Sequence, residues 1–219
     1  MDRPAPHHTY DHIADHFAAT REYPWPEIES FVDGVDRVGL ALDVGCGNGR
    51  HAEVLAAHAD RVVALDASRG LLRTARRRER DHGFDADLVQ GDAAALPLRN
   101  DCVGLAVYVA TLHHLRPRAR RVASLDELAR VLEPGGRALV SAWSTVHDRF
   151  DADEGFDTTV DWTLPGGETV PRYYHIYDPV EFDRDLAASA LAVHESFESS
   201  GNCYAVVGPA RSGSNAAQT

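Results

Sequence analysis

Lysine is absent from this chain: all 22 of its basic residues are arginine, against 34 acidic residues, and the formal net charge is −12. We expect such an acidic, lysine-free composition in a protein adapted to concentrated salt, where a Debye length of roughly 3 Å at 1 M weakens self-repulsion. High genomic GC content would also replace lysine by arginine, but it would not by itself produce the acidity. In concentrated salt the acidity argues less strongly than usual against nucleic-acid binding, because counterion release contributes little there.

Cysteines and long apolar runs are also scarce. The three cysteines, Cys46, Cys102 and Cys203, lie far apart without metal-type spacing, which excludes a disulfide framework and favours a reducing compartment. No run is apolar enough for a spanning helix and none resembles a signal peptide, so we expect a soluble, cytoplasmic protein with no membrane association. The 219 residues suffice for one domain, which we place at 1–208, followed by a flexible tail at 209–219.

Apolar runs and helix signals alternate through the middle of the chain. Strands are expected at 38–44, 61–65, 86–90, 103–110 and 137–143. Helices are expected between them at 50–58, 68–81 and 117–132. This alternation is typical of an α/β fold with a doubly wound, mostly parallel sheet. An antiparallel hairpin of 191–198 and 203–208 would end the chain and bring the sheet to seven strands.

Two segments stand apart from that alternation. Residues of about 8–35 form a helical cap, with a first helix at 10–19 and a second at 26–32. Residues of about 144–177 are rich in Asp, Thr and Gly and show no periodicity, which predicts a long substrate loop before a last helix at 179–189.

The strongest motif is the turn from Asp43 to Gly49, Asp-Val-Gly-Cys-Gly-Asn-Gly, which joins an apolar strand to a helix. This layout is usual for a nucleotide-cofactor site, where glycines let the backbone approach a ligand. A dinucleotide fingerprint would need its third glycine where Arg50 stands, so that ligand is disfavoured. Taken alone, the turn could be only a tight corner between strand and helix. Its candidate cofactor contacts are Asp43, Gly45, Cys46, Gly47, Asn48 and Gly49.

Acidic residues also follow the next two strands. Asp66 comes about 20 positions after the turn, where a carboxylate can accept from both hydroxyls of a ribose. Asp92 follows the third strand. Each alone could be a helix cap or a turn residue, but three acids that end successive strands favour a cofactor site. We add their neighbours Ala67, Ala93 and Val109 to it.

The glycine spacing behind Asp43 resembles motif I of class I S-adenosylmethionine methyltransferases, whose Rossmann-like fold places the residue corresponding to Asp92 beside the adenine amino group. Several further motifs together resemble the tRNA wobble-uridine carboxymethyl methyltransferases. They are Tyr10–Phe17, Thr20-Arg21, Pro24–Pro26, Leu96–Arg99, Thr111–His114, Arg120-Arg121 and Pro171–His175. The resemblance runs from about Tyr10 to Val207. It implies S-adenosylmethionine as cofactor and the carboxyl group of 5-carboxymethyluridine in tRNA as methyl acceptor. The chain departs from the family at Ser144-Thr145, where a longer polar linker is expected, and at Asn202-Cys203, where Asn-Trp is commoner.

A carboxylate acceptor needs no general base, because its pKa near 4 leaves it ionised at neutral pH. The protein must only align the partners and hold the carboxylate. Under the resemblance, Arg21 and Arg172 grip the carboxylate or a flanking phosphate, and His114 faces the reacting methyl group. Three aromatic residues, Trp25, Tyr173 and Tyr174, would stack on bases. His175, the last residue of the Pro171–His175 motif, is also a candidate site residue.

No metal site is expected. His8, His12 and His16 share one face of the first helix, but histidines four apart arise easily by chance in a chain that has 12 of them. The resemblance does imply a partner, a small zinc-containing activator subunit that pairs with an edge strand. Here that strand would be Ala86–Gln90, with Leu88 partly exposed.

Two other functions remain open on the sequence: a small-molecule carboxyl or hydroxyl methyltransferase, and a non-catalytic cofactor-binding module. Two arginine clusters are also ambiguous, because each could be an ordinary solvated helix face or a contact for RNA. The clusters are Arg73, Arg76–Arg78 and Arg80, and Arg116, Arg118, Arg120 and Arg121.

Overall fold

The computed structural model describes residues 6–210, so the predicted tail lies outside it beyond residue 210. The helices are α1 (Pro6–Ala19), α2 (Pro26–Asp33), α3 (Arg50–His58), α4 (Arg69–His82), the 3₁₀ turn η1 (Leu112–His114), α5 (Arg118–Val131) and α6 (Pro179–Ala187). The strands are β1 (Val38–Val44), β2 (Ala59–Asp66), β3 (Asp87–Gln90), β4 (Val103–Tyr108), β5 (Leu132–Trp143), β6 (Phe156–Thr163), β7 (Thr169–Ile176), β8 (Leu191–Ser199) and β9 (Asn202–Pro209). Within this part of the chain, no helix has the length and apolar character needed to cross a membrane.

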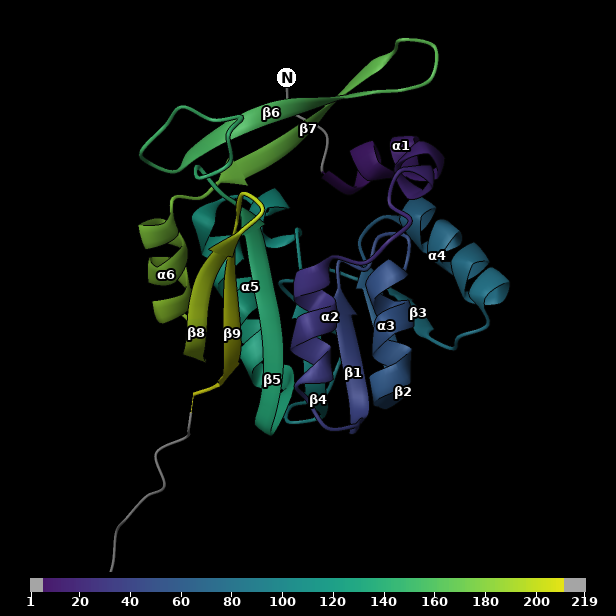
Figure 1. The fold of residues 1–219 in the computed structure, drawn as a ribbon, viewed down its shortest axis with the longest axis vertical. Coiled ribbons are helices and arrows are strands. Elements are labelled where there is room, and N and C mark those ends of the chain that lie inside the picture. The colour runs from purple at the N-terminus through teal and green to yellow at the C-terminus, as the bar shows by residue number, and fades with distance from the viewer. Residues whose placement is uncertain (1–5, 211–219) are drawn as a thin grey trace, which may run out of the picture.

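Seven strands form one sheet in the order β3-β2-β1-β4-β5-β9-β8 (Figure 1). Strands β1 to β5 are parallel, and β9 runs antiparallel between β5 and β8. The predicted α/β fold with a seven-stranded, mostly parallel sheet and a terminal hairpin is therefore confirmed. The order reverses between β1 and β4, and in open α/β sheets ligands bind in the crevice at that switch point.

Helices cover both faces of this sheet (Figure 1). On one face, α2 and α3 pack Ile28 and Leu55 against Ala41 and Leu105. On the other face, α5 and α6 pack against the alternate residues of the same strands, such as Leu42. Because both faces are covered, all six residues of β4 are buried, which is why that strand is a continuous apolar run in the sequence.

The predicted loop of 144–177 is wrong in one respect, because most of it is an ordered β-hairpin. Strands β6 and β7 pair antiparallel over their full length as a separate two-stranded sheet, which lies above the main sheet beside α1 (Figure 1). The period-2 signal was present in Phe156, Thr158, Val160 and Trp162. Asp and Thr between them made the segment look polar, since only one side of this hairpin is buried.

The predicted end of the helix near residue 132 is confirmed, but the strand that follows begins earlier than the predicted residue 137. Strand β5 begins at Leu132, which pairs with Val103, and the register then shifts before Leu105 pairs with Arg137. Pro-Gly-Gly is thus a bulge inside an extended strand. A proline is tolerated there because a bulge interrupts the ladder of hydrogen bonds.

Helix α1 is held to the start of α4 by one carboxylate. Asp11 Oδ1 accepts hydrogen bonds from the Ser68 hydroxyl at 2.8 Å and from the Gly70 N–H at 2.6 Å. Ser68 also caps α4 by accepting from the N–H of Leu71, as the sequence predicts. Gly70 lets the helices approach closely, since a Cβ there would lie 2.9 Å from the Cα and carbonyl oxygen of Asp11.

The substitution Gly70→Ala should therefore destabilise the fold. Overpacking against a backbone costs about 1–3 kcal/mol, more than the helix propensity that alanine gains. Urea unfolding of the purified chain measures the change. Gly39→Ala is the control, because a Cβ at Gly39 would meet nothing within 4 Å. Equal stability of the two variants would show that α1 and α4 separate at little cost.

Candidate functional site

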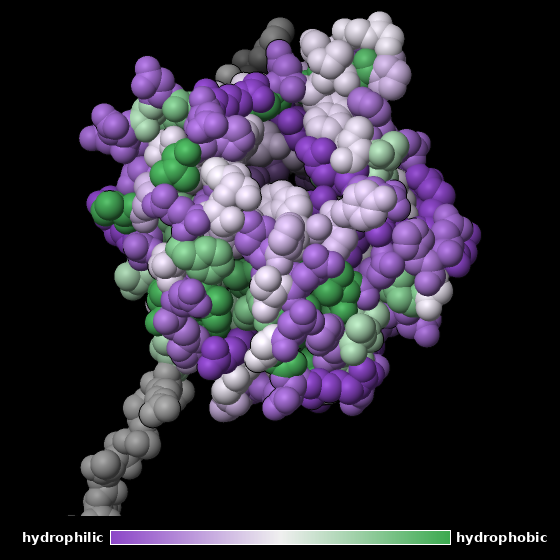
Figure 2. Space-filling model, viewed as in Figure 1, coloured by the Kyte–Doolittle hydropathy of each residue, from purple (hydrophilic) through white to green (hydrophobic). Residues whose placement is uncertain are grey.

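A cavity of about 690 Å³ opens at the carboxyl ends of the parallel strands, beneath the hairpin (Figure 2). Seven of the predicted site residues line it: Gly45, Gly47, Asp66, Ala67, Asp92, Ala93 and His114. The sequence did not identify several other residues of the lining, among them Tyr10, Phe17 and Thr111. These three residues belong to motifs that carry the family resemblance, but no role in the site was predicted for them.

The glycine turn is shaped for close approach of a ligand. Gly45 and Gly47 have φ values of 75° and 56°, which side chains disfavour. A Cβ on Gly45 would lie 2.1 Å from Thr111 Oγ1, so no other residue fits there. The carboxylate of Asp66 holds the turn in place, since its Oδ2 accepts from the Gly47 N–H at 2.9 Å.

The other predicted cofactor residues support this turn from outside the cavity lining. Asp43, Cys46 and Val109 are buried, and burial raises the pKa of the Cys46 thiol well above its usual value. Asn48 Nδ2 donates to the carbonyl of Arg21 at 2.8 Å and so fixes the segment after α1. The last glycine, Gly49, is the left-handed N-cap of α3.

Two buried carboxylates lie at the cofactor turn: Asp66 lines the cavity, and Asp43 lies outside its lining. Burial, and then the charge of Asp66, raises the pKa of Asp43 to about 7. Burial also raises the pKa of Asp66 to about 6, against hydrogen bonds from Ser68 and Gly47 that lower it. Asp43 Oδ2 is buried without a hydrogen-bond partner. A buried acceptor without a donor is costly. Of the two carboxylates only Asp66 lines the cavity, where it fits a ligand that brings N–H groups and positive charge.

Asp92 is engaged by an arginine in this structure. Arg120 forms an ion pair with Asp92 Oδ2, while Asp92 Oδ1 accepts from the Ala94 N–H at 2.9 Å. Both Asp92 and Arg120 line the cavity. A ligand that uses Asp92 would therefore share it with Arg120, as the free lone pairs of a carboxylate allow.

A directed chain of hydrogen bonds forms the opposite wall. His114 Nδ1 lies 2.9 Å from the carbonyl oxygen of Tyr173, so this nitrogen carries the proton. His114 Nε2 must then accept from the Tyr10 hydroxyl at 3.0 Å. Tyr10 in turn lies 3.3 Å from the Tyr174 hydroxyl, which accepts from Arg172 at 2.6 Å. Burial, followed by the Arg172 charge, lowers the pKa of His114 to about 4, so the ring is neutral at pH 7 despite the Tyr173 carbonyl.

Arg172 is buried, with 7% of its surface exposed, and no carboxylate neutralises it among the described residues. Its Nε has no hydrogen-bond partner. The guanidinium lies 4.7 Å from the ring of Trp162, and the guanidinium of Arg21 lies 5.5 Å from the same ring. The structure thus brings the two predicted arginines onto one tryptophan of the hairpin, which the sequence did not identify. A buried cation without a counter-ion is a candidate anion site.

Trp25 lies elsewhere. It precedes α2, its ring is 5.4 Å from the guanidinium of Arg50 and 6.4 Å from the ring of His51, and it does not line the cavity. It packs against the cluster between α2, α3 and the sheet. The structure therefore does not bring Trp25 together with Arg172.

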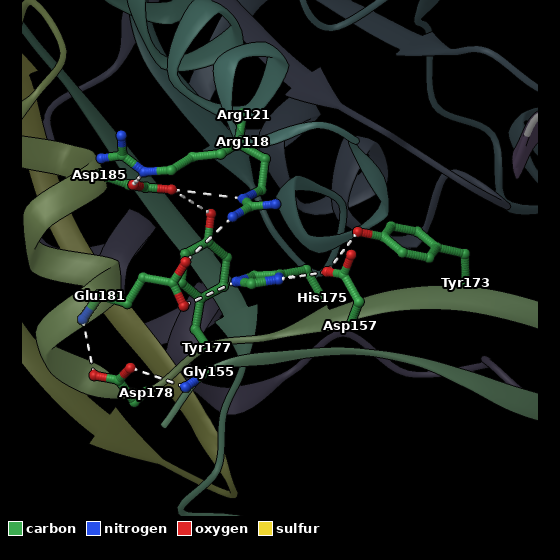
Figure 3. Close-up of polar contacts among 10 residues, drawn as sticks. All are labelled: Arg118, Arg121, Gly155, Asp157, Tyr173, His175, Tyr177, Asp178, Glu181 and Asp185. Carbon is green, nitrogen blue, oxygen red and sulfur yellow. Dashed lines mark hydrogen bonds and ion pairs between the residues drawn. The ribbon is translucent and has the colours of Figure 1, made fainter. Parts of the chain in front are cut away.

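His175 does not line the cavity; it joins the hairpin to the main body (Figure 3). Its ring lies between Asp157 Oδ1 at 2.8 Å and Glu181 Oε2 at 2.9 Å. Glu181 also pairs with Arg121, which brings β6, β7, α6 and α5 into one network. Tyr173 is at its edge, where its hydroxyl donates to Asp157. Salt bridges of this kind fix the angle of the hairpin over the site.

The histidines of α1 also contact the hairpin. His12 lies 3.0 Å from Glu168, and His16 accepts a hydrogen bond from Trp162 Nε1. Within residues 6–210 there is no group of three potential ligands that could hold a metal ion.

The pKa of Asp43 predicts how stability changes with pH. Its pKa of about 7 exceeds the unfolded value of about 3.9, so the folded state binds the proton more tightly. This contribution to stability is fully present below about pH 4 and is lost as the pH rises through about 7. Asp43→Asn should therefore weaken the fall in unfolding free energy between about pH 4 and pH 7, by at most about 4 kcal/mol. Urea unfolding across that range measures it. Asp85→Asn, an exposed carboxylate, should leave the profile unchanged; identical profiles for both variants and the parent chain would contradict the prediction.

Comparison with known proteins places this site in a family. Residues 42–140 match the methyltransferase domain model. The chain is 36% identical over 145 residues to the tRNA (carboxymethyluridine(34)-5-O)-methyltransferase alkbh8 of Xenopus tropicalis, covering 66% of this chain but only 22% of that protein. Its fold resembles the structure described as a complex between the Haloferax volcanii Trm112 methyltransferase activator and the putative methyltransferase, with a TM-score of 0.68 and 16% identity over 93% of this chain and 97% of that one.

A fission-yeast relative is matched almost completely. The tRNA (carboxymethyluridine(34)-5-O)-methyltransferase of Schizosaccharomyces pombe is 30% identical over 217 residues, which span 86% of this chain and 90% of that protein. At this coverage the relationship extends well beyond the matched residues 42–140. The chain therefore belongs to the family of tRNA (carboxymethyluridine(34)-5-O)-methyltransferases.

Proposed function

We propose that this chain is the catalytic subunit of an S-adenosylmethionine-dependent methyltransferase that esterifies the 5-carboxymethyl group of a modified wobble uridine in tRNA. The observation that carries the proposal is the pairing of two half-sites: an acid-lined cavity under the glycine turn, and the buried, unneutralised Arg172 beyond its Tyr10 and His114 wall. The first suits a cationic donor and the second an anionic acceptor.

The residues present fit the cofactor. S-adenosylmethionine supplies a methyl group on a positively charged sulfur and carries an amino group and a ribose. Asp66 lines the cavity and keeps lone pairs beyond those used by Gly47 and Ser68, while Asp43, outside the lining, has an unpartnered buried oxygen. Asp92 stands at the far end of the same cavity. These carboxylates favour a cation, and the glycines admit it without a steric clash.

The wall of the cavity suits an acceptor that is already ionised. In the chain from Arg172 to the Tyr173 carbonyl every proton is committed, and His114 Nε2 already accepts from Tyr10. No residue in it is a free base that could take a proton from a hydroxyl acceptor. A carboxylate needs none, because transfer makes the new C–O bond as the C–S bond breaks and releases no proton. This favours a carboxyl over a hydroxyl acceptor.

Nucleoside analysis of tRNA tests the proposal. In a strain that lacks this chain, mass spectrometry should show loss of the carboxymethyluridine methyl ester and accumulation of its free acid. Complementation with the parent chain should restore the ester. An unchanged wobble-nucleoside profile would overturn the proposal and favour a small-molecule carboxyl methyltransferase.

Arg172→Gln tests the anion site. Removal of a buried cation that holds the acceptor carboxylate should lower kcat/KM for tRNA by roughly 10²-fold or more, while binding of S-adenosylmethionine, measured by calorimetry, stays unchanged. Arg149→Gln is the matched control, since Arg149 is exposed and lies only over the Trp143 ring at 5.9 Å. Loss of cofactor binding in Arg172→Gln would assign this arginine to the donor half instead.

We further propose that an activator subunit adds to the edge of the sheet at β3, by analogy with the Haloferax volcanii assembly. Strand β3 is the outermost strand on that side, and Leu88 is only partly buried. Cytoplasmic location and adaptation to salt are proposed with it, on the composition alone.

A further inference from the structure

We propose that the outer face of α4 is a docking surface for the phosphate backbone of RNA. The face consists of Arg69, Arg73, Arg76 and Arg80, which we call the arginine stripe. Their spacing of four, three and four residues places them on one side of the helix, and all four are exposed. The proposal rests on the tRNA substrate proposed above and specifies where that substrate is held.

Charge distribution is the first support. Helix α4 carries six arginines and only two carboxylates, although the whole chain has a net charge of −12. Within residues 6–210, Arg69, Arg73 and Arg80 form no ion pair or hydrogen bond, and only Arg76 of the stripe is paired, with Glu79. A strongly acidic protein that leaves three neighbouring arginines without carboxylates keeps a local positive surface.

The second arginine cluster of the sequence shows the contrast. Arg118 pairs with Asp185 at 2.6 Å, Arg120 pairs with Asp92, and Arg121 lies 3.2 Å from Glu181. These arginines of α5 are therefore neutralised within the protein, by carboxylates of α6 and by a carboxylate of the cavity lining. The sequence could not separate the two clusters, because the carboxylates that neutralise the second lie far away along the chain.

Most of the stripe does not serve the stability of its own helix, because only Arg80 lies in the last turn, where a cation is favourable. Arg69 is the first residue of α4, at the positive end of the helix dipole, and the first turn has no acidic residue. Arg69 and Arg73, and Arg76 and Arg80, are like charges four residues apart, which repel. An arrangement that destabilises the isolated helix points to a use outside the protein.

Position and chemistry favour RNA as the occupant. The stripe begins beside the cavity, since Asp66, Ala67 and Leu71 at the start of α4 line it. It then runs outward for about 16 Å, the length of eleven residues of helix. A face made only of guanidinium groups matches phosphates, which arginine binds in a bidentate manner. It lacks the aromatic or aliphatic anchor that the centre of a protein interface requires, which disfavours the activator subunit as its occupant.

The test compares two triple variants of equal net charge. One is Arg69→Gln, Arg73→Gln and Arg80→Gln. The matched control is Arg99→Gln, Arg137→Gln and Arg184→Gln, three exposed arginines elsewhere that are in no ion pair among the described residues. Both are co-expressed with the activator subunit, and circular dichroism verifies the fold at each salt concentration. The probe is an unmodified tRNA transcript, whose binding is followed by fluorescence anisotropy.

The stripe variant should bind the transcript at least about 10-fold more weakly at 0.1 M salt, and the slope of log K against log salt should fall by about 2, as three lost phosphate contacts predict. For methyl transfer, KM for tRNA should rise while kcat and cofactor binding stay unchanged. Thermal stability should be equal to or above that of the parent chain, which a merely structural role of the stripe would not give.

Three results with the variants would overturn the proposal, and a fourth with the parent protein is given below. They are unchanged affinity and slope in the stripe variant, an equal loss in the control variant, and loss of the activator subunit with RNA binding intact. The two proposals can be told apart. If the stripe variant loses transcript affinity as expected but the deletion strain keeps the methyl ester, the proposed reaction is wrong and the docking surface is supported. If the parent protein binds no tRNA at all, the docking surface is overturned directly.

Discussion

The carboxylate of Asp66 organises both halves of the site. One oxygen accepts from the Gly47 N–H and shapes the cofactor turn, and the other accepts from the Ser68 N–H at 2.8 Å and sets the start of α4. Ser68 in turn binds Asp11, which seats α1. Because α1 carries Tyr10 into the cavity wall, the position of the acceptor half follows from hydrogen bonds that begin at the donor half. A single buried acid thus couples the two.

This coupling has an electrostatic cost that the ligands can offset. Asp43 and Asp66 are buried with pKa values of about 7 and about 6, so near neutral pH they are partly ionised without a counter-ion. Arg172 is the converse case, a buried cation with an unpartnered Nε. Such groups destabilise an empty protein, and they become favourable contacts only with a cationic donor and an anionic acceptor in place. The charges of the site are therefore complementary to its proposed ligands, at the expense of the stability of the empty protein.

The sheet could be predicted from the sequence because its strands are buried on both faces. A strand such as β4, with every residue buried, leaves an unbroken apolar run that no helix or loop would produce at that length. The cofactor turn was equally visible, since Gly45 and Gly47 are required by local backbone geometry. Strands β6 and β7 were missed because their buried side packs into a small cluster of its own, with Trp143 and Phe150, rather than into the continuous core. Aspartates and threonines on the other side then dilute the alternation.

The acceptor half was less predictable because its geometry comes from contacts between distant segments. The sequence singled out Arg21 and Arg172 but gave no reason for them to meet, and Trp162, on whose ring both lie, has no motif around it. His175 was predicted as a site residue, but it does not line the cavity. It forms hydrogen bonds with Asp157 and Glu181 between the hairpin and α6. A local pattern can identify a residue that needs a special backbone, whereas a residue that needs a special partner is identified only when the fold brings the partner to it.

That distinction applies to the arginines as a whole. Those of α5 became structural ties because the fold supplies them with carboxylates, and those on the outer face of α4 remain available to a ligand because, apart from Arg76, they have none among the described residues.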